Sequence, residues 1–368
     1  MIAIFLALLS GLVPSWLGAG NGVISEEENA AIPPSLTTRP AQNGALIVSL
    51  AGSSGATIYY TVDDSTPEAS SPRYQAPFLV ASNLTVKAIA IRGGRRSAVR
   101  TQTFSLNISP GTLVWSDEFS NSTGSRRPDP TIWTYDTGKR GFGNHELETY
   151  CAWDSSTAPC SSASPNSYVG NDGYLHIIAR QPSNGVYSSA RLKTQGYFSF
   201  QYGRFEVRAQ VPEARGLWPA VWLMGNNILE VNWPACGEQD VLERVNAPKQ
   251  PDWNEGSIHG IGFTGKTGLG TMYRFPRGKT AAQWHTYGMR WSPGNVSYYV
   301  DNPGHPYATY TPASLRGIRG AVWPFDRGQS NFIILNLAVG GNWPGPPDPD
   351  HTPFPSEILV DYVRIYSN

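Results

Sequence analysis

Charged residues are scarce in this chain of 368 residues. Asp, Glu, Lys and Arg together make up 15% of it, and 28 acidic residues balance 28 basic ones, so that the formal net charge is zero. The chain has neither a basic tract nor an acidic tail. A nucleic acid or an anionic lipid surface, which proteins attract through clustered Lys and Arg, is therefore not the expected partner.

Long helical patterns and long apolar runs are also lacking, with one exception. No stretch repeats apolar residues at a period of 3.6, which argues against a helical fold. Residues 1–20, MIAIFLALLSGLVPSWLGAG, are apolar and uncharged, and we interpret them as a signal peptide cut near residue 20. The segment has no Lys or Arg at its start, and an uncleaved membrane anchor is the alternative. We expect a secreted or extracytoplasmic protein without membrane contact after cleavage.

Cysteine is rare, with three residues in the whole chain. Cys151 and Cys160 bracket the loop CAWDSSTAPC, and in an exported protein this spacing permits a local disulfide. The remaining Cys236 lies two residues before a group of acids, and we expect a buried small residue there rather than a nucleophile. No C-x-x-C pair exists, so these cysteines do not predict a metal site.

Aromatic and turn-forming residues are abundant by contrast. The chain has 12 Trp, 18 Tyr and 13 Phe, together with 38 Gly and 30 Pro. This combination is typical of a loop-rich all-β protein. Its Trp side chains either stack on flat, uncharged ligands or fill a large sandwich core, and composition alone leaves both interpretations open.

Strand-length apolar runs divide the chain into two parts. After a flexible polar segment, 21–31, residues 32–107 alternate runs such as TIYYTV and LTVKAIAI with turn residues, which predicts a small Ig-like β-sandwich. Residues 108–112 form a short linker. From 113 to 368 strands recur every eight to twelve residues, so we expect one large antiparallel β domain with two packed sheets.

The stretch GEQDVLE places Glu238, Asp240 and Glu243 within six residues of an otherwise apolar run. On a regular strand, Glu238 and Asp240 share a face and Glu243 points away. A β-bulge at Val241–Leu242 would bring all three acids to one face. The alternatives are a solvated acidic strand edge and a calcium site, although calcium prefers more oxygen ligands on a loop.

Two glutamates on one face could bring their carboxyl groups to about 5 to 6 Å, the separation of a retaining glycosidase. One carboxylate then attacks the sugar and the other protonates the leaving oxygen. Three acids this close cannot all ionise easily, so at least one pKa should rise. A raised pKa would suit Glu243 as the general acid.

The part before the linker resembles a known module. YYTVDDSTP, the following Tyr and LTVKAIA are similar to the Ig-like module at the end of chitobiases, which also occurs in bacterial secreted hydrolases. The resemblance implies a spacer or accessory role.

The larger part, 113–368, resembles laminarinases of glycoside hydrolase family 16. WPACGEQDVLE is similar to the family's bulged E-x-D-x-x-E signature, and GFGNHELETY, LWPAVWLMG, SIHG, FIILNLAVGGNWPG and LVDYVRIY follow the family's order. The resemblance implies a concanavalin A-like β-jelly roll with an open sugar cleft. It also implies Glu238 as the nucleophile, Glu243 as the acid/base and Asp240 as the residue that positions Glu238.

The resemblance further implies endo-hydrolysis of a laminarin-like β-1,3-glucan with retention, by a monomer that needs no cofactor for catalysis. Mixed-linkage β-1,3-1,4-glucan and galactans are alternative substrates within the family. Binding of β-glucan without cleavage is a more distant alternative, which the presence of both glutamates disfavours.

Several further residues are candidates for sugar binding. Trp218 and Trp222 share a face by their spacing, and indole rings stack on sugars and donate a hydrogen bond. The alternative is that both are core residues. The resemblance adds Arg191 as a hydroxyl donor, with a surface salt bridge as an equal alternative. His259, on the expected neighbouring strand, is a candidate to bond a sugar hydroxyl or the acid/base, with a hydrogen-bonded core histidine as the alternative. Asn144 and Trp343 are candidates for the rim of the cleft.

The family resemblance also implies one structural Ca²⁺ away from the chemistry. Its ligands would be Asp361 together with backbone carbonyls near Glu118 and Gly173, since calcium prefers oxygen. The sequence departs from the family at Gln239, where an aliphatic residue is usual. Its amide should point between the sheets and needs hydrogen-bond partners there.

Overall fold

The computed structural model describes residues 31–245 and 252–368. The expected signal peptide, 1–20, and all but the last residue of the polar segment 21–31 lie outside the described residues. The described part is all-β, as the sequence predicted. It has one short α-helix, α1 (Ile228–Val231), and three 3-10 turns, η2 (Gly141–Gly143), η3 (Gly265–Thr267) and η4 (Pro312–Leu315).

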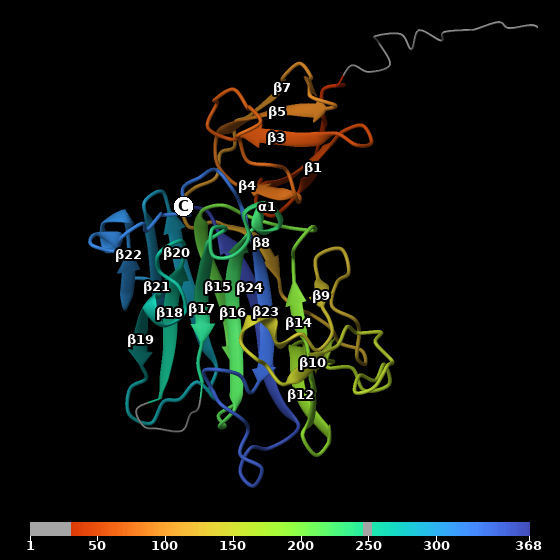
Figure 1. The fold of residues 1–368 in the computed structure, drawn as a ribbon, viewed down its shortest axis with the longest axis vertical. Helices are drawn as coiled ribbons and strands as arrows, with labels where there is room; N and C mark the ends of the chain where they lie inside the picture. The colour runs from red at the N-terminus through yellow and green to blue at the C-terminus, as the bar shows by residue number, and fades with distance from the viewer. Residues whose placement is uncertain (1–30, 246–251) are drawn as a thin grey trace, which may run out of the picture.

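The N-terminal module is a small sandwich of two sheets, drawn at the top of Figure 1. One sheet contains β1 (Ser35–Pro40), β2 (Leu46–Ala51) and β4 (Phe78–Val80). The other contains β3 (Thr57–Thr61), β5 (Leu84–Arg92), β6 (Arg95–Arg96) and β7 (Arg100–Phe104). Alternate residues of these strands, including Val48, Tyr60 and Val86, point inward and form the module's own core.

The larger domain consists of two stacked sheets of ten and seven strands (Figure 1). The ten-stranded sheet contains β8 (Leu113–Asp117), β10 (Glu148–Tyr150), β11 (Ser167–Val169), β12 (Leu175–Ser183), β13 (Val186–Ser189), β15 (Gly203–Gln210), β20 (His285–Ser292), β21 (Asn295–Val300), β22 (Ala308–Tyr310) and β24 (Ser356–Tyr366).

The seven-stranded sheet carries the site. Its strands lie in the order β19 (Leu269–Arg274), β18 (Trp253–His259), β17 (Glu238–Glu243), β16 (Leu217–Gly225), β23 (Asn331–Val339), β14 (Arg191–Lys193) and β9 (Thr134–Asp136). Val221 and Leu223 of β16 join the core between the two sheets. The alternating residues, among them Trp218 and Trp222, therefore point to the outer face.

The module is joined to the larger domain by much more than the chain connection. Ala45, Ile47 and Leu79 belong to the same buried cluster as Phe198 of the larger domain. The backbone of Ser199 exchanges two hydrogen bonds with the module, one from its N–H to Pro77 O and one from Leu79 N–H to its carbonyl, each 3.0 Å. The two parts therefore share a core and a strand-like contact.

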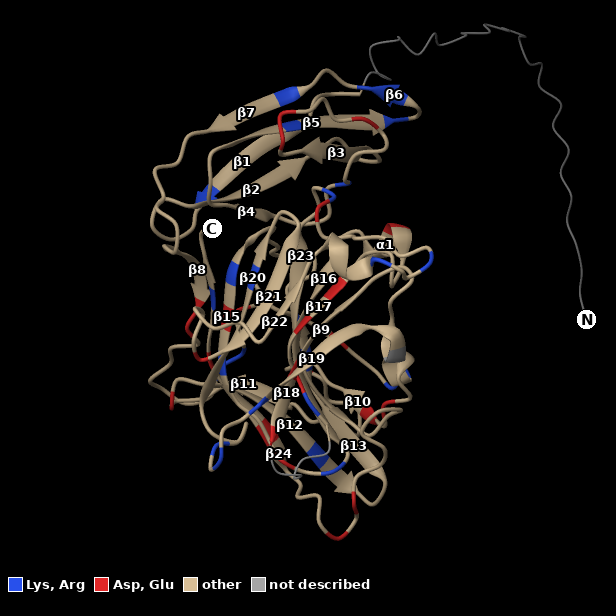
Figure 2. Ribbon diagram, turned by 90° about the vertical axis from the view of Figure 1, so that its left-hand side faces the viewer, with Lys and Arg blue, Asp and Glu red and all other residues tan. Residues whose placement is uncertain are grey.

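Charges are interspersed along the ribbon of both parts, as the composition suggested (Figure 2). Within the part of the chain that the structure describes, no helix has the length and apolar character required to cross a bilayer.

Candidate active site

Strand β17 contains the bulge that the acid spacing predicted. Residues 221 and 222 of β16 are consecutive, but their partners on β17 are Leu242 and Asp240. Val241 is therefore the extra residue of a β-bulge, within the predicted position Val241–Leu242. Val241 and Leu242 both enter the core between the sheets, so Glu243 returns to the face of Glu238 and Asp240.

A buried asparagine on the neighbouring strand holds the bulge. Asn254 of β18 is fully buried, and its Nδ2 donates to Val241 O at 3.2 Å while its Oδ1 accepts from Glu243 N–H at 3.2 Å. A bulge leaves backbone groups without ladder partners, and a buried unpaired group costs about 1–3 kcal/mol. Asn254 satisfies both groups and thereby fixes the direction of the Glu243 side chain.

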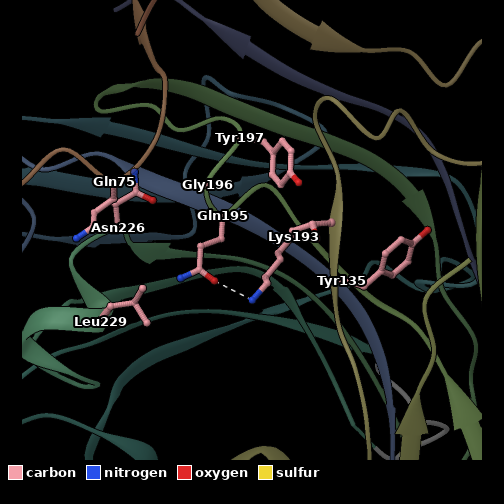
Figure 3. Close-up of a pocket in the computed structure, with 9 residues that line it drawn as sticks. Gln75, Tyr135, Lys193, Gln195, Gly196, Tyr197, Asn226 and Leu229 are labelled. Carbon is pink, nitrogen blue, oxygen red and sulfur yellow. Dashed lines mark hydrogen bonds between the residues drawn. The ribbon is translucent and has the colours of Figure 1, made fainter. Parts of the chain in front are cut away.

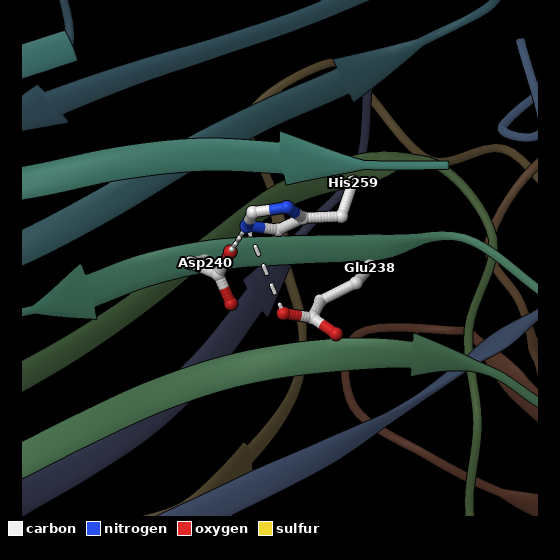
Figure 4. Close-up of side chains that lie close together, drawn as sticks. All are labelled: Glu238, Asp240 and His259. Carbon is white, nitrogen blue, oxygen red and sulfur yellow. Dashed lines mark ion pairs between the residues drawn. The ribbon is translucent and has the colours of Figure 1, made fainter. Parts of the chain in front are cut away.

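Asp240 lies at the centre of a hydrogen-bonded cluster with β18. Ser257 Oγ donates to Asp240 Oδ2 at 2.5 Å, and His259 Nε2 lies 3.2 Å from the same oxygen and 3.9 Å from Glu238 Oε1. Figure 4 shows the His259 ring pointing at Asp240 and Glu238 from the adjacent strand. The register pairs Glu238 with His259 and Asp240 with Ser257, which is why these side chains meet.

Each glutamate is held by an indole N–H. Trp218 Nε1 donates to Glu243 Oε1 at 2.9 Å, and Trp233 Nε1 donates to Glu238 Oε2 at 2.7 Å. Both acids remain partly exposed on the outer face. A fixed donor on one oxygen leaves the other oxygen of each carboxyl group for chemistry.

The clustered, partly buried acids compete for protons. Burial, then the charge of Asp240, raises the pKa of Glu238 to about 8. Burial, then the charges of Asp240 and Glu238, raises the pKa of Glu243 well above its usual range. Burial alone would lower the pKa of His259, but the hydrogen bond and charge of Asp240 outweigh it and raise this pKa to about 9.

These shifts bear on two roles. His259 is positively charged at neutral pH and lies beside Glu238, and it lowers the pKa of that acid against the effect of burial. Glu243 has Asp240 and Glu238 beside it, and their charges add to burial in raising its pKa, which suits a proton donor. A pair of carboxyl groups of which one ionises and one stays protonated can perform nucleophilic attack and acid catalysis.

A hydrogen-bonded chain connects the outer face to the loops at its edge. Trp222 Nε1 donates to Asn336 Oδ1 at 2.8 Å, Asn336 Nδ2 donates to Tyr150 OH at 3.2 Å, and Tyr150 OH donates to Glu146 Oε2 at 2.8 Å. Asn144, a predicted sugar ligand, donates to the other oxygen of Glu146 at 3.2 Å. The predicted residues Trp222 and Asn144 thus belong to one network.

Arg191 forms the salt bridge that was the alternative to a role as hydroxyl donor. It forms the salt bridge to Asp136, with Nε 3.0 Å from Oδ2. Its guanidinium also lies 4.8 Å from the centre of the Trp222 ring and 5.1 Å from that of Phe142. The ion pair therefore places Arg191 over the aromatic surface beside the acids.

Trp343 lies near Trp218, which donates to Glu243. Its ring meets Trp218 edge-to-face at 5.5 Å and lies 5.9 Å from Trp253. With 39% of its surface exposed, Trp343 offers a ring face to a ligand. The structure therefore groups Trp218, Trp222 and Trp343 around the acids rather than in the core between the sheets.

The three predicted calcium residues line one hollow, on the side of the ten-stranded sheet. Arg364 donates to both carboxylate oxygens of Glu118, at 2.9 and 2.8 Å, and Arg208 donates to Oδ2 of Asp361 at 2.6 Å. These bonds leave Asp361 Oδ1 and the backbone carbonyls for a cation. The atoms that could bind a metal here are all oxygens, so the site fits calcium rather than a softer metal.

Three other expectations concern the frame of the site. Cys151 and Cys160 form a disulfide, and Cys236 is a buried free cysteine. Gln239 points between the sheets as expected, and its Oε1 accepts a hydrogen bond from Asn331 Nδ2 at 3.0 Å. Its Nε2 has no hydrogen-bond partner among the described residues. Only one of the two polar atoms of the Gln239 amide is therefore hydrogen-bonded.

Four residues of the site were not predicted. Trp233 lies five residues before Glu238, in the segment WPACGEQDVLE. Ser257 lies two residues before His259 on the same strand, so strand alternation could have indicated Ser257. Asn254 and Asn336 carry no such signal. Their role depends on which strands become neighbours, which a single sequence does not display.

A β-sandwich with two glutamates of raised pKa on one face, among Trp side chains, defines the chain as a glycoside hydrolase. It belongs to glycosyl hydrolases family 16, whose family model matches residues 155–352. The Fn3 associated family matches residues 48–104. The chain is 38% identical over 265 residues to a β-glucanase of Rhodothermus marinus, covering 69% of this chain and 84% of the relative.

Two other similarities are informative. The structure of the catalytic domain of an endo-1,3-β-glucanase (laminarinase) from Thermotoga petrophila RKU-1 superimposes with a TM-score of 0.61 and 36% identity, over 71% of this chain and 99% of that one. An endo-1,3-1,4-β-glycanase of Rhizobium meliloti is 30% identical, over 73% of this chain and 52% of the relative. The predicted family and jelly-roll fold are thus confirmed.

Proposed function

We propose that this chain is a secreted, monomeric endo-β-1,3-glucanase that acts on laminarin-like glucans with retention of configuration. The observation that carries the proposal is the bulge at Val241, which sets Glu238 and Glu243 on one face, each with its own Trp donor. The similarity to the Thermotoga endo-1,3-β-glucanase supports the β-1,3 linkage.

In this mechanism, Glu238 attacks the anomeric carbon and Glu243 donates its proton to the leaving glycosidic oxygen. The product is a glycosyl–enzyme ester on Glu238, and the released chain carries the proton as a new hydroxyl group. Glu243, now ionised, takes a proton from water, which attacks the ester and frees Glu238. His259 pairs with Glu238 at 3.9 Å and is itself held by Asp240 at 3.2 Å, so Asp240 positions Glu238 through His259.

The test compares purified protein on laminarin, lichenan and agarose in parallel. Release of oligosaccharides from laminarin above the other two supports the proposal, whereas preference for lichenan indicates the mixed-linkage alternative and preference for agarose indicates a galactan hydrolase. Proton NMR of the first product should show the β-anomer. A first-formed α-anomer would contradict the two-glutamate mechanism.

Variants separate hydrolysis from binding. Glu238→Gln and Glu243→Gln should each lower kcat on laminarin by at least about a thousandfold, as removal of a nucleophile does in other hydrolases. Glu238→Ser should retain laminarin binding by affinity electrophoresis. A wild-type protein that binds laminarin without cleaving it would support the binding-protein alternative.

We also propose one structural Ca²⁺ in the hollow of Glu118, Gly173 and Asp361. Treatment with a chelator should lower Tm, and added Ca²⁺ should restore it, because an ion that binds only the folded state stabilises it. Asp361→Asn should remove the response to chelator. Equal Tm with and without chelator would contradict the site.

A further inference from the structure

A separate hollow lies where the N-terminal module meets the seven-stranded sheet. Its volume is about 350 Å³, within the range of ligand sites. Figure 3 shows side chains from both parts of the chain around it. The module contributes Gln75, and the larger domain contributes Lys193, Gln195, Tyr197, Asn226 and Leu229.

The strand register places this hollow in line with the acids. Lys193 of β14 pairs with residue 334 of β23, which pairs with Trp222 of β16, which pairs with Asp240 of β17. These residues form a row on the outer face, perpendicular to the strands. Three interstrand steps of about 4.8 Å separate Lys193 from Asp240, roughly 14 Å, a distance that a glucan chain crosses in a few sugar units.

The cation at the hollow is already engaged by protein groups. Lys193 Nζ donates to Asp136 Oδ1 at 2.6 Å and to Gln195 Oε1 at 2.7 Å, and Asp136 is shared with Arg191. The other polar groups around the hollow include the amides of Gln75 and Asn226. Neutral amides pair well with hydroxyl groups, which both donate and accept hydrogen bonds.

An aromatic ring and a fixed amide complete the surface. Tyr197 is 43% exposed at the hollow, and an exposed ring can stack on the apolar face of a sugar. Gln75 Nε2 donates to Glu230 Oε1 at 2.5 Å. This bond across the boundary between the module and the larger domain fixes the Gln75 side chain, so the amide is ordered before a ligand arrives.

We propose that this hollow is a distal subsite, which binds a glucosyl unit of the same β-glucan chain that is cleaved at Glu238 and Glu243. The inference rests on the proposed function, and it makes the N-terminal module part of the substrate-binding surface. The glucan follows the row of paired residues from Asp240 to Lys193, on the Arg191 side of the acids.

The test measures kcat/KM of the full chain on β-1,3-linked oligosaccharides from the trisaccharide to the heptasaccharide. Gln75→Ala and Tyr197→Ala should each lower kcat/KM for the heptasaccharide about fivefold to tenfold, mainly through KM, because each removes about one sugar contact. The trisaccharide, too short to reach the hollow, should be cleaved as by wild type. Tyr197→Phe, which keeps the ring, should lower kcat/KM for the heptasaccharide less than Tyr197→Ala does.

Gln102→Ala is the matched control, since Gln102 lies on β7 of the same module and bonds only to the neighbouring Thr103 carbonyl in the described structure. Unchanged heptasaccharide kinetics in both Gln75→Ala and Tyr197→Ala, or an equal loss on the trisaccharide, would overturn the subsite while leaving the β-1,3-glucanase function in place. A wild type that cleaves no β-1,3-oligosaccharide would overturn that function and, with it, the subsite.

Discussion

Burial around strand β17 decides which side chain holds a proton. The pKa values of Glu238, Glu243 and His259 are all raised. Glu238 must lose its proton to attack, and Glu243 must keep one to donate. We therefore expect a bell-shaped dependence of kcat/KM on pH, whose rising limb follows the ionisation of Glu238 and whose falling limb follows that of Glu243.

His259 should set the position of both limbs. Its positive charge lowers the pKa of Glu238 and of Glu243, so His259→Asn should move both limbs to higher pH and leave less activity at neutral pH. Initial rates on laminarin across a pH series measure this shift. His351→Asn, at a residue whose side chain is 81% exposed, is the control and should keep the wild-type profile. A shift to lower pH would contradict the charge assigned to His259.

Glu243 should also make stability depend on pH. Its pKa is raised in the folded state, so the folded protein keeps a proton that the unfolded chain releases above about pH 4.3. The stabilisation from this group is complete below that pH and is lost as pH rises through the folded-state pKa. Glu243→Gln, which never ionises, should therefore have a higher Tm than wild type at pH 8 and about the same Tm at pH 4.

Scanning calorimetry at the two pH values measures this difference, and Glu68→Gln, at an exposed residue of the module, should change Tm at neither. A Glu243→Gln variant less stable than wild type at pH 8 would show that the ionised carboxylate is tolerated in the folded state.

At the scale of the element, the bulge in β17 depends on Asn254. Asn254→Ala leaves Val241 O and Glu243 N–H without their partner, and we expect a loss of about 1–3 kcal/mol in the free energy of unfolding. We also expect a fall in kcat of about a hundredfold, because a small displacement of an acid from its working geometry has that order of effect. KM should change little, since the Trp side chains remain.

Asn166→Ala is the matched control. Asn166 is equally buried and donates to Ile178 O and Ser188 Oγ, but it lies beside the ten-stranded sheet. It should lose comparable stability in urea titrations and keep its kcat. Equal kcat losses in the two variants would assign the effect of Asn254 to stability alone.

The same element shows how far sequence reasoning reaches. The bulge, the shared face of the three acids and the shared face of Trp218 and Trp222 could all be predicted, because each follows from spacing along one strand. The partners Asn254, Asn336 and Trp233 could not. They depend on which strands and loops lie side by side, and the alternation within one strand holds no information about that. Gln239 was expected inside the core, but its bond to Asn331 on β23 again required the sheet order.

At the scale of the molecule, the two β-sandwiches should unfold together. Leu79 of the module lies in the core cluster of the larger domain, so a charge there removes the contact that couples them. Calorimetry of wild type should show one transition, and Leu79→Lys should show two. Val80→Ala, whose residue packs within the module's own core, should lower Tm without splitting the transition. Two transitions in wild type would contradict the shared core.

The shared core also constrains the order of events during synthesis. A chain is made from its N-terminus, and domains usually fold as they emerge. The module can complete its two sheets early, but Ala45, Ile47 and Leu79 then face water until Phe198 and its neighbours have been made. The nascent module thus exposes an apolar surface that is covered only when the larger domain folds against it. If the chain is exported, this apolar surface has to be protected from aggregation until folding is complete.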